Sequence, residues 1–258
     1  MSGKSSNLQK VTFVKHWTEN LFSFRITRPS SFRFRSGEFV MIGLPNEEGK
    51  PILRAYSIAS PSWSEELEFY SIIVKNGPLT SKLKNIKIND SIVMMPKSTG
   101  TLVLDALKPG KRLFLLSSGT GFAPFASLIQ EPETYEKFEH VILTHTCRTV
   151  DELNYSKETI KNCFDNDIIK EFISNKLICY HSTTRENYTN KGRITDLIIS
   201  GKLLKDLTLS EISENDRFMF CGSMGLNNDL KGIMQKLSFQ EGANNKPGDY
   251  VLEKAFVN

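Results

Sequence analysis

Alternating apolar and polar positions dominate the first hundred residues of the chain. In residues 21–27, Phe22, Phe24 and Ile26 alternate with polar neighbours, which is the period of a β-strand with one buried face. Five more strands are predicted at residues 11–14, 38–42, 54–58, 67–74 and 91–95, separated by clusters of Gly, Pro, Asn and Asp. Six short strands at this spacing predict a small antiparallel β-barrel.

The pattern changes near residue 105, where apolar runs begin to alternate with helical segments. Strands are predicted at residues 112–117, 141–145, 177–180, 218–221 and 249–252, and helices at 123–129, 151–163, 195–204 and 227–237. Several of these strands are continuously apolar, as parallel strands covered on both faces require. The chain is therefore predicted to form two domains, a barrel over residues 1–104 and a doubly wound α/β domain over residues 105–258.

Composition and charge exclude several classes of protein. The chain has 258 residues and a formal net charge of +4, which is far from the basic density of nucleic-acid binders but suits an acidic partner protein. No apolar run approaches the roughly 20 residues of a membrane span, and the first residues lack a secretory signal, so we expect no membrane insertion and a cytoplasmic location. The four cysteines lie too far apart in sequence to predict a metal centre.

A glycine-containing turn follows the first strand of the second domain. Residues 117–124 read Ser-Ser-Gly-Thr-Gly-Phe-Ala-Pro. Gly119 and Gly121 allow close approach of a pyrophosphate to the backbone, and the start of the next helix supplies free N–H groups and a positive dipole end. The turn indicates a dinucleotide site, although an ordinary strand-to-helix turn has a similar sequence.

Three arginines follow predicted strands of the same domain. Arg148 stands where NAD-binding domains usually carry an acidic residue for the ribose. Arg185, next to Thr184, and Arg193 follow the next strand. Together the arginines favour a nucleotide with a 2′-phosphate, NADP(H), because charge-assisted hydrogen bonds to phosphate are strong. The alternative is three solvated surface side chains.

Two motifs in the first domain suit a flavin nucleotide. Arg54, Ala55, Tyr56 and Ser57 lie on a predicted strand, where Arg54 and Tyr56 share one side. The tyrosine ring can stack on an isoalloxazine and the guanidinium can pair with a pyrophosphate. Gly77, Pro78, Leu79, Thr80 and Ser81 end another strand and offer backbone N–H groups and two hydroxyls to a phosphate. Each motif alone also suits a plain strand or a capped helix.

Taken in order, five motifs make the chain resemble the ferredoxin–NADP reductase family over nearly its whole length. They are residues 54–57, 77–81 and 119–124, Cys221-Gly222-Ser223, and the C-terminal Glu253-Lys-Ala-Phe-Val-Asn258. More narrowly, the chain is similar to bacterial ferredoxin/flavodoxin–NADP reductases that end in an Ala-Phe-Val segment. The resemblance implies a six-stranded FAD-binding barrel, an NADP(H)-binding α/β domain, and an isoalloxazine between them.

The resemblance also assigns roles to individual residues. It places Arg54, Ala55, Tyr56 and Ser57 at the flavin, Tyr70, Ser71, Ile72, Ile73 and Val74 along its ribityl and phosphate part, and Gly77–Ser81 at its pyrophosphate. Thr120, Gly121 and Gly222 are expected near the nicotinamide, and Arg148, Thr184, Arg185 and Arg193 at the 2′-phosphate. Ala255 is expected against the flavin face, Phe256 toward the adenine, and Asp229 at the nicotinamide ribose or as a helix cap.

The catalytic residues implied by the resemblance are Ser57, Cys221, Glu253 and Ala255. Glu253, together with Ser57, is expected to relay a proton to flavin N5. The alternatives are a surface salt bridge for Glu253 and core packing for Cys221. The implied reaction moves a hydride between NADP(H) and FAD, and then electrons singly to ferredoxin or flavodoxin. A monomer is expected. Two alternatives remain: the reductase component of an oxygenase or a free-flavin reductase, and a non-catalytic redox sensor.

Overall fold

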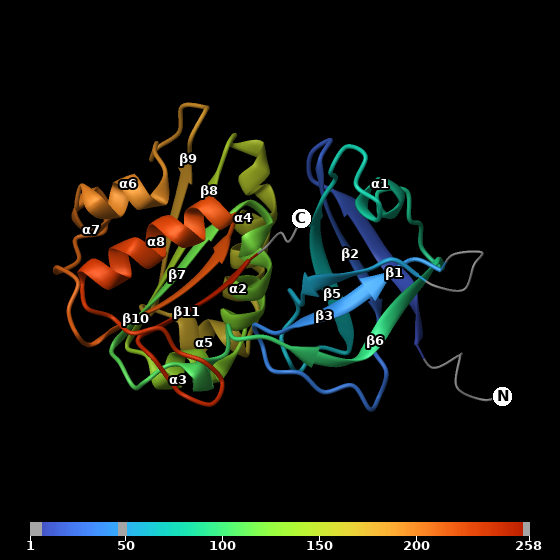
Figure 1. Cartoon of the computed structure of the whole chain (residues 1–258), viewed down its shortest axis with the longest axis horizontal. Helices are drawn as coiled ribbons and strands as arrows, with labels where there is room; N and C mark the ends of the chain where they lie inside the picture. The colour runs from blue at the N-terminus through green and yellow to red at the C-terminus, as the bar shows by residue number, and fades with distance from the viewer. Residues whose placement is uncertain (1–6, 46–50, 255–258) are drawn as a thin grey trace.

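The computed structural model describes residues 7–45 and 51–254 and contains two sheets (Figure 1). The first is an antiparallel sheet of six strands in the order β4-β3-β6-β1-β2-β5. Its strands are β1 (Leu8–His16), β2 (Leu21–Thr27), β3 (Phe39–Gly43), β4 (Leu53–Ser57), β5 (Glu66–Ile72) and β6 (Ser91–Thr99). A single bridge between Ile58, just after β4, and Phe69 of β5 brings the two edge strands together. The predicted six-stranded antiparallel barrel is confirmed.

The barrel is closed around side chains that the alternation in β2 points inward. Phe22, Phe24 and Ile26 are fully buried in one apolar cluster, together with Ile42 of β3 and Phe69 of β5. A short helix, α1 (Thr80–Leu83), lies at one end of the barrel and buries Leu83 in the same cluster. The barrel therefore has its own core, and the faces of its strands are fixed by the sequence pattern.

The second sheet is parallel, with the strand order β11-β10-β7-β8-β9. Its strands are β7 (Arg112–Ser118), β8 (His140–Cys147), β9 (Leu177–Thr183), β10 (Asp216–Gly222) and β11 (Tyr250–Lys254). Seven helices connect them: α2 (Ala123–Leu128), α3 (Pro132–Lys137), α4 (Asn154–Asp165), α5 (Ile169–Ile173), α6 (Ile194–Ile199), α7 (Lys202–Asp206) and α8 (Met224–Lys236).

Helices cover both faces of the parallel sheet, as the continuously apolar strands predicted. Leu113 and Leu115 of β7 pack on the side of α2 to α5, while Phe114 and Leu116 pack on the side of α6 to α8. Figure 1 shows α2 and α4 between this sheet and the barrel. The doubly wound α/β architecture is confirmed. The predicted domain boundary, between residues 104 and 105, falls in the connection from β6 to β7 and stays a prediction.

The helix predicted over residues 195–204 is wrong in detail, because two helices occupy this stretch. Gly201 has a φ of +70°, a left-handed conformation that ends α6 and starts α7. Two short helices, α3 and α5, were not predicted. Each has only five or six residues, too few for a helical period to stand out.

The two lobes are joined by an apolar core and by specific hydrogen bonds. Glu131, just before α3, accepts hydrogen bonds from the Ser36 hydroxyl at 2.5 Å and the Ser62 backbone N–H at 2.6 Å. Lys15 of β1 also forms a salt bridge with Glu158 of α4 at 2.6 Å. These contacts fix the position of one lobe against the other and thereby the shape of the space between them.

Candidate functional site

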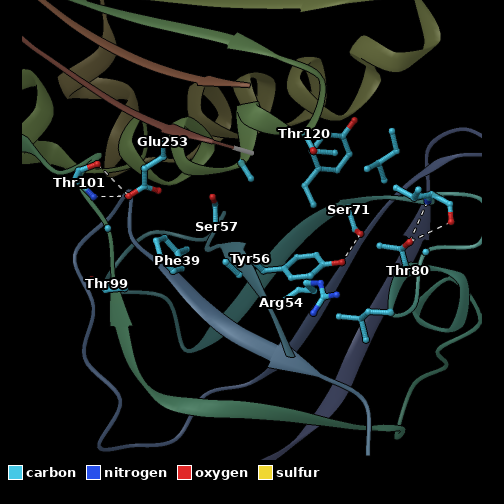
Figure 2. A pocket seen from close by; sticks show the side chains of 18 of the residues that line it. Phe39, Arg54, Tyr56, Ser57, Ser71, Thr80, Thr99, Thr101, Thr120 and Glu253 are labelled. Atoms are coloured by element: carbon cyan, nitrogen blue, oxygen red, sulfur yellow. Dashed lines mark hydrogen bonds between the residues drawn. The ribbon is translucent and has the colours of Figure 1, made fainter. Parts of the chain in front are cut away.

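A cavity of about 670 Å³ lies where the barrel meets the α/β lobe (Figure 2). Its volume is in the range of small-molecule and cofactor sites. The barrel contributes most of the wall, and the second lobe closes it with Thr120, Ala123, Asn244, Leu252 and Glu253. The barrel residues in the wall are Phe39, Arg54, Ala55, Tyr56, Ser57, Tyr70, Ser71, Ile72, Val74, Gly77, Pro78, Leu79, Thr80, Thr99, Gly100 and Thr101.

Strand β4 presents an aromatic ring and a cation to the cavity. Tyr56 is buried, and its hydroxyl lies 3.0 Å from the Ser71 hydroxyl of β5. This bond fixes the ring of Tyr56, and burial raises the pKa of the phenol. Arg54, two residues earlier, is exposed, and among the described residues its side chain donates only to the carbonyl of its neighbour Leu53. Its guanidinium therefore keeps donors available for an anion in the cavity.

The loop before α1 offers backbone donors at one end of the cavity. The Thr80 hydroxyl bonds to both backbone groups of Val74, and the Ser81 hydroxyl donates to the Gly77 carbonyl at 2.5 Å. These two hydroxyls thus close the loop on itself. In the described part of the chain, the N–H groups of Leu79 and Thr80 have no hydrogen-bond partner, so both are free donors.

Glu253 of β11 enters the cavity wall from the second lobe. Its Oε1 accepts hydrogen bonds from the Thr101 N–H at 2.5 Å and from the Thr101 hydroxyl at 3.4 Å. Burial raises the pKa of this carboxyl to about 7, although the Thr101 donors act in the opposite direction. Figure 2 shows Glu253 near Ser57 on the same side of the cavity. The two lobes thus bring a carboxyl that titrates near neutrality to the wall of the cavity.

A buried hydroxyl without a partner also belongs to this cavity wall. Tyr70 is 3% exposed, and its ring stacks on Tyr155 of α4 with the centroids 4.1 Å apart. Within the described residues its hydroxyl makes no hydrogen bond. A buried hydroxyl in this state favours a bound polar group or water.

The turn after β7 brings the backbone of the second lobe up to the cavity. Gly119 has a φ of +53°, and Thr120 and Ala123 line the cavity. A Cβ on Gly121 would lie 2.1 Å from the carbonyl oxygen of Cys221 in β10. Any other residue at position 121 would push this turn away from β10, so the glycine is required for the close packing of turn and strand.

The three predicted arginines gather on neighbouring loops at the ends of β8 and β9. The N–H of Arg185 donates to the carbonyl of Arg148 at 3.0 Å, which joins the two loops. The loop then folds back, where Gly192 donates to the Thr183 carbonyl and leads into Arg193. All three arginine residues are exposed, and none forms a salt bridge within the described residues.

The nearby carboxylates are already held by other groups. Glu152 accepts from the backbone N–H of Arg148, and Glu186 from that of Val150, each at 2.7 Å. These bonds shape the loop and keep both carboxylates on backbone donors. The arginine side chains are therefore available to an external anion.

Several predicted residues lie outside the cavity wall. Cys221 is 1% exposed in the core of the second lobe, where burial and Glu253 raise the pKa of its thiol. Asp229 is exposed on α8. Ile73, Ser81, Gly121, Thr184 and Gly222 also lie outside the wall, and Ala255 and Phe256 lie outside the described residues.

Other residues of the wall were not predicted. The Asn244 side chain donates to the Gly100 carbonyl at 2.9 Å, although 144 positions separate the two in sequence. Phe39, Thr99, Thr101, Ala123 and Leu252 also line the cavity. Thr101 follows Gly100 just after β6, but the predicted strand ended at residue 95, so the pattern did not place Thr101 at a strand end. Asn244 had no signal, because a loop between helix and strand carries no periodic pattern.

Within residues 7–45 and 51–254, no three His, Cys, Asp or Glu side chains converge as metal ligands. None of the helices described there has the length and apolar character needed to cross a bilayer.

Comparison with known proteins places this arrangement in a family. The family model described as oxidoreductase FAD-binding domain matches residues 5–103. A flavodoxin/ferredoxin–NADP reductase of Rhodobacter capsulatus is 55% identical over 250 residues, covering 96% of this chain and 93% of the relative. A ferredoxin–NADP reductase of Azotobacter vinelandii is 48% identical over 256 residues, covering 97% and 98%.

A solved structure shares the arrangement of both lobes. It is a ferredoxin NADP⁺ reductase from Neisseria gonorrhoeae with bound FAD and NADP, and it superposes with a TM-score of 0.87 at 27% identity, covering 96% of this chain and 98% of the other. The matched lengths of both relatives span the two lobes of this chain. This chain belongs to the ferredoxin/flavodoxin–NADP reductase family.

Proposed function

We propose that this chain is a cytoplasmic, monomeric, FAD-dependent oxidoreductase that transfers electrons between NADP(H) and ferredoxin or flavodoxin. The observation that carries the proposal is the cavity in which the Arg54–Ser57 strand of the barrel meets Thr120 and Glu253 of the second lobe. The location and the monomeric state are expectations carried over from the sequence.

The residues of the cavity fit an FAD molecule. The fixed ring of Tyr56 offers a face for the isoalloxazine, and the Arg54 guanidinium offers donors for the pyrophosphate. The free N–H groups of Leu79 and Thr80 would hold a phosphate oxygen, and the unpartnered Tyr70 hydroxyl would gain a polar neighbour. A bound FAD would thus satisfy groups that the protein alone leaves open.

FAD supplies the redox chemistry, because it takes two electrons from NADPH and returns them one at a time. The protein holds the reactants and manages a proton. Because burial raises the pKa of the Glu253 carboxyl to about 7, this group can both hold and release a proton near neutrality. The Thr101 donors and the neighbouring β10 strand keep this carboxyl at the cavity wall.

The arginine cluster determines which nucleotide binds. Arg148, Arg185 and Arg193 would surround the 2′-phosphate, which carries nearly two negative charges near neutrality. NAD(H) lacks this group, so it cannot form the same charge-assisted hydrogen bonds. NADP(H) is therefore the expected nucleotide.

Two of the most similar relatives support the choice of electron partner. The names of the Rhodobacter and Azotobacter proteins include ferredoxin, and the first also includes flavodoxin. The positive net charge of +4 suits an acidic partner of this kind through electrostatic steering.

The test is spectroscopic. The purified protein is expected to be yellow, or to become yellow on addition of FAD, and NADPH is expected to bleach the flavin band anaerobically much faster than NADH. The reduced protein is then mixed with oxidised flavodoxin or ferredoxin, whose reduction is followed by its own absorbance. A protein that stays colourless with FAD would contradict the flavoenzyme, and equal bleaching by both nucleotides would contradict the arginine assignment.

A further inference from the structure

A buried hydrogen-bonded chain of side chains lies behind the glycine turn, in a part of the second lobe that the proposed chemistry does not use. His145 of β8 is 1% exposed. Its Nδ1 lies 2.8 Å from the Ser156 hydroxyl of α4, and its Nε2 lies 2.9 Å from the Gly119 carbonyl. The Ser156 hydroxyl in turn lies 3.0 Å from Nε2 of His181 on β9.

These contacts define which nitrogen of His145 carries the proton. A carbonyl oxygen only accepts, so Nε2 must donate to Gly119. In a neutral ring Nδ1 is then the acceptor, and Ser156 donates to it. The Ser156 oxygen remains free to accept from Nε2 of His181. The Leu153 carbonyl lies 2.9 Å from the same hydroxyl and competes for the serine proton. Donation to His145 is favoured because it gives the buried Nδ1 a donor.

The surroundings of His145 keep the ring neutral and in place. Burial and the nearby His181 lower its pKa to about 3. Phe122, from the turn itself, stacks on the imidazole with the centroids 4.8 Å apart. The Cys147 thiol lies 3.2 Å from Nε2, and burial raises its pKa, so it also stays uncharged. No proton is gained or lost here in the physiological range.

The bond to Gly119 determines where the next N–H points. The peptide between Gly119 and Thr120 is trans, and in a trans peptide the C=O of one residue and the N–H of the next point in opposite directions. Because His145 holds the Gly119 carbonyl inward, the Thr120 N–H points away from the core. Thr120 itself lines the cavity. The glycine, with its φ of +53° and no atom near its absent side chain, would otherwise be free to rotate this peptide.

We propose that His145, supported by Ser156, is a positioning residue that locks the Gly119–Thr120 peptide with its N–H facing the nucleotide. This inference rests on the proposed function and on the prediction from the sequence that the turn binds the pyrophosphate and nicotinamide part of NADP(H). The locked peptide and the arginine loops would bind different parts of the nucleotide. The arginine loops hold the 2′-phosphate without any contribution from the Gly119–Thr120 peptide.

The test compares three substitutions in the full-length, FAD-loaded protein. His145→Gln places an amide N–H near the position of Nε2 and keeps the donor to Gly119. His145→Asn places its amide near Nδ1 and loses that donor, and His145→Leu removes both polar atoms. Titration calorimetry then measures the dissociation constants of NADP⁺ and of adenosine 2′-phosphate, which carries only the part that the arginines hold.

We expect His145→Leu and His145→Asn to weaken NADP⁺ binding by about tenfold or more, with adenosine 2′-phosphate changed less than about twofold and His145→Gln close to the wild type. In the wild type, ¹⁵N NMR should find Nε2 protonated and Nδ1 unprotonated at pH 7. If the leucine variant does not fold, the NADP⁺ dissociation constants of the asparagine and glutamine variants alone test the inference.

Three results would overturn the inference: unchanged NADP⁺ binding in the asparagine variant, equal loss of both ligands in all variants, or a proton on Nδ1. A wild-type protein that binds adenosine 2′-phosphate but not NADP⁺ would instead count against the proposed function itself, so the two failures are distinguishable.

Discussion

The cavity and the arginine loops hold their ligands by opposite means. The cavity is enclosed by two lobes, and its side chains are fixed before any ligand arrives, as the bond between Tyr56 and Ser71 illustrates. The arginines are exposed on loops, and the backbone bond from Arg185 to Arg148 positions the loops but not the guanidinium groups.

The difference separates affinity from selectivity. In the cavity, few side chains have to change rotamer when the ligand binds, so little conformational entropy is lost. Shape and burial therefore determine whether FAD stays bound. At the arginines, selectivity depends on charge pairs formed only when a 2′-phosphate is present. Substitutions in the cavity should therefore affect the binding of FAD, whereas substitutions of the arginines should affect the preference for NADP(H) over NAD(H).

The largest effect is expected from removing two of the arginines. The double variant Arg148→Ala/Arg185→Ala should lower the preference for NADPH over NADH by about two to four orders of magnitude, because each lost charge-assisted bond costs about 1.5–3 kcal/mol. Steady-state kinetics with both nucleotides measure this ratio, and the flavin spectrum measures retained FAD.

The control for this variant is Lys205→Ala/Lys236→Ala, which removes the same charge from exposed positions on α7 and α8. Its nucleotide preference should equal that of the wild type. If the control loses as much preference as the arginine variant, the effect belongs to overall charge, and the comparison between the two regions fails.

Most of the fold could be predicted from the sequence because both sheets leave a clear period. The alternation in β2 predicted the buried face of the barrel, and the continuous apolar run of β7 predicted a strand covered on both faces. The division of residues 195–204 could not be predicted from helical period alone, since it depends on the conformation of Gly201.

The candidate site was predictable where its residues lie in one short motif on one element. Arg54–Ser57 and the loop from Gly77 are of this kind, and both line the cavity. Asn244 and Gly100 meet only through the tertiary fold, and the His145 chain joins four separate segments. Contacts of this kind depend on how the lobes pack, which no local pattern encodes.

The second largest effect is expected inside the cavity. Arg54→Ala should raise the dissociation constant of FAD by about 10- to 100-fold, because the cavity loses its charge-assisted donors to the pyrophosphate. Fluorescence titration of the apoprotein with FAD measures this constant. Lys97→Ala, at an exposed position of β6 outside the cavity wall, should leave it unchanged. A normal constant in the Arg54 variant would remove this residue from the FAD site.

A pH-dependent effect is expected from Glu253. Its pKa is raised to about 7 in the fold from an ordinary value of 4.5, so the folded state favours the protonated form. The resulting stability is fully present below pH 4.5 and is lost as the pH rises to 7. The difference in unfolding free energy between wild type and Glu253→Gln should therefore change by about 1–2 kcal/mol between pH 5.5 and 7, to the disadvantage of the wild type at the higher pH.

Urea unfolding of the FAD-free protein at several pH values measures this difference. Glu65→Gln, which changes an exposed carboxylate, is the control and should show no such trend. A flat difference for Glu253→Gln across the range would mean that folding leaves the pKa of this carboxyl at its ordinary value, which would remove it as a proton carrier near neutrality.

The smallest effect is expected from the Tyr56 hydroxyl, and it sharpens the claim that the cavity is fixed in advance. Tyr56→Phe keeps the ring but removes its bond to Ser71, so the ring must be ordered by FAD itself. One hydrogen bond contributes about 1 kcal/mol, which corresponds to about a fivefold weaker binding of FAD.

The matched control is Tyr135→Phe, which removes a buried bond to the Ile129 carbonyl outside the cavity wall. Both variants should lose stability, but only Tyr56→Phe should lose FAD affinity. If the two variants bind FAD equally well, the fixed ring contributes nothing to affinity, and the enclosure by the two lobes alone distinguishes the cavity from the arginine loops.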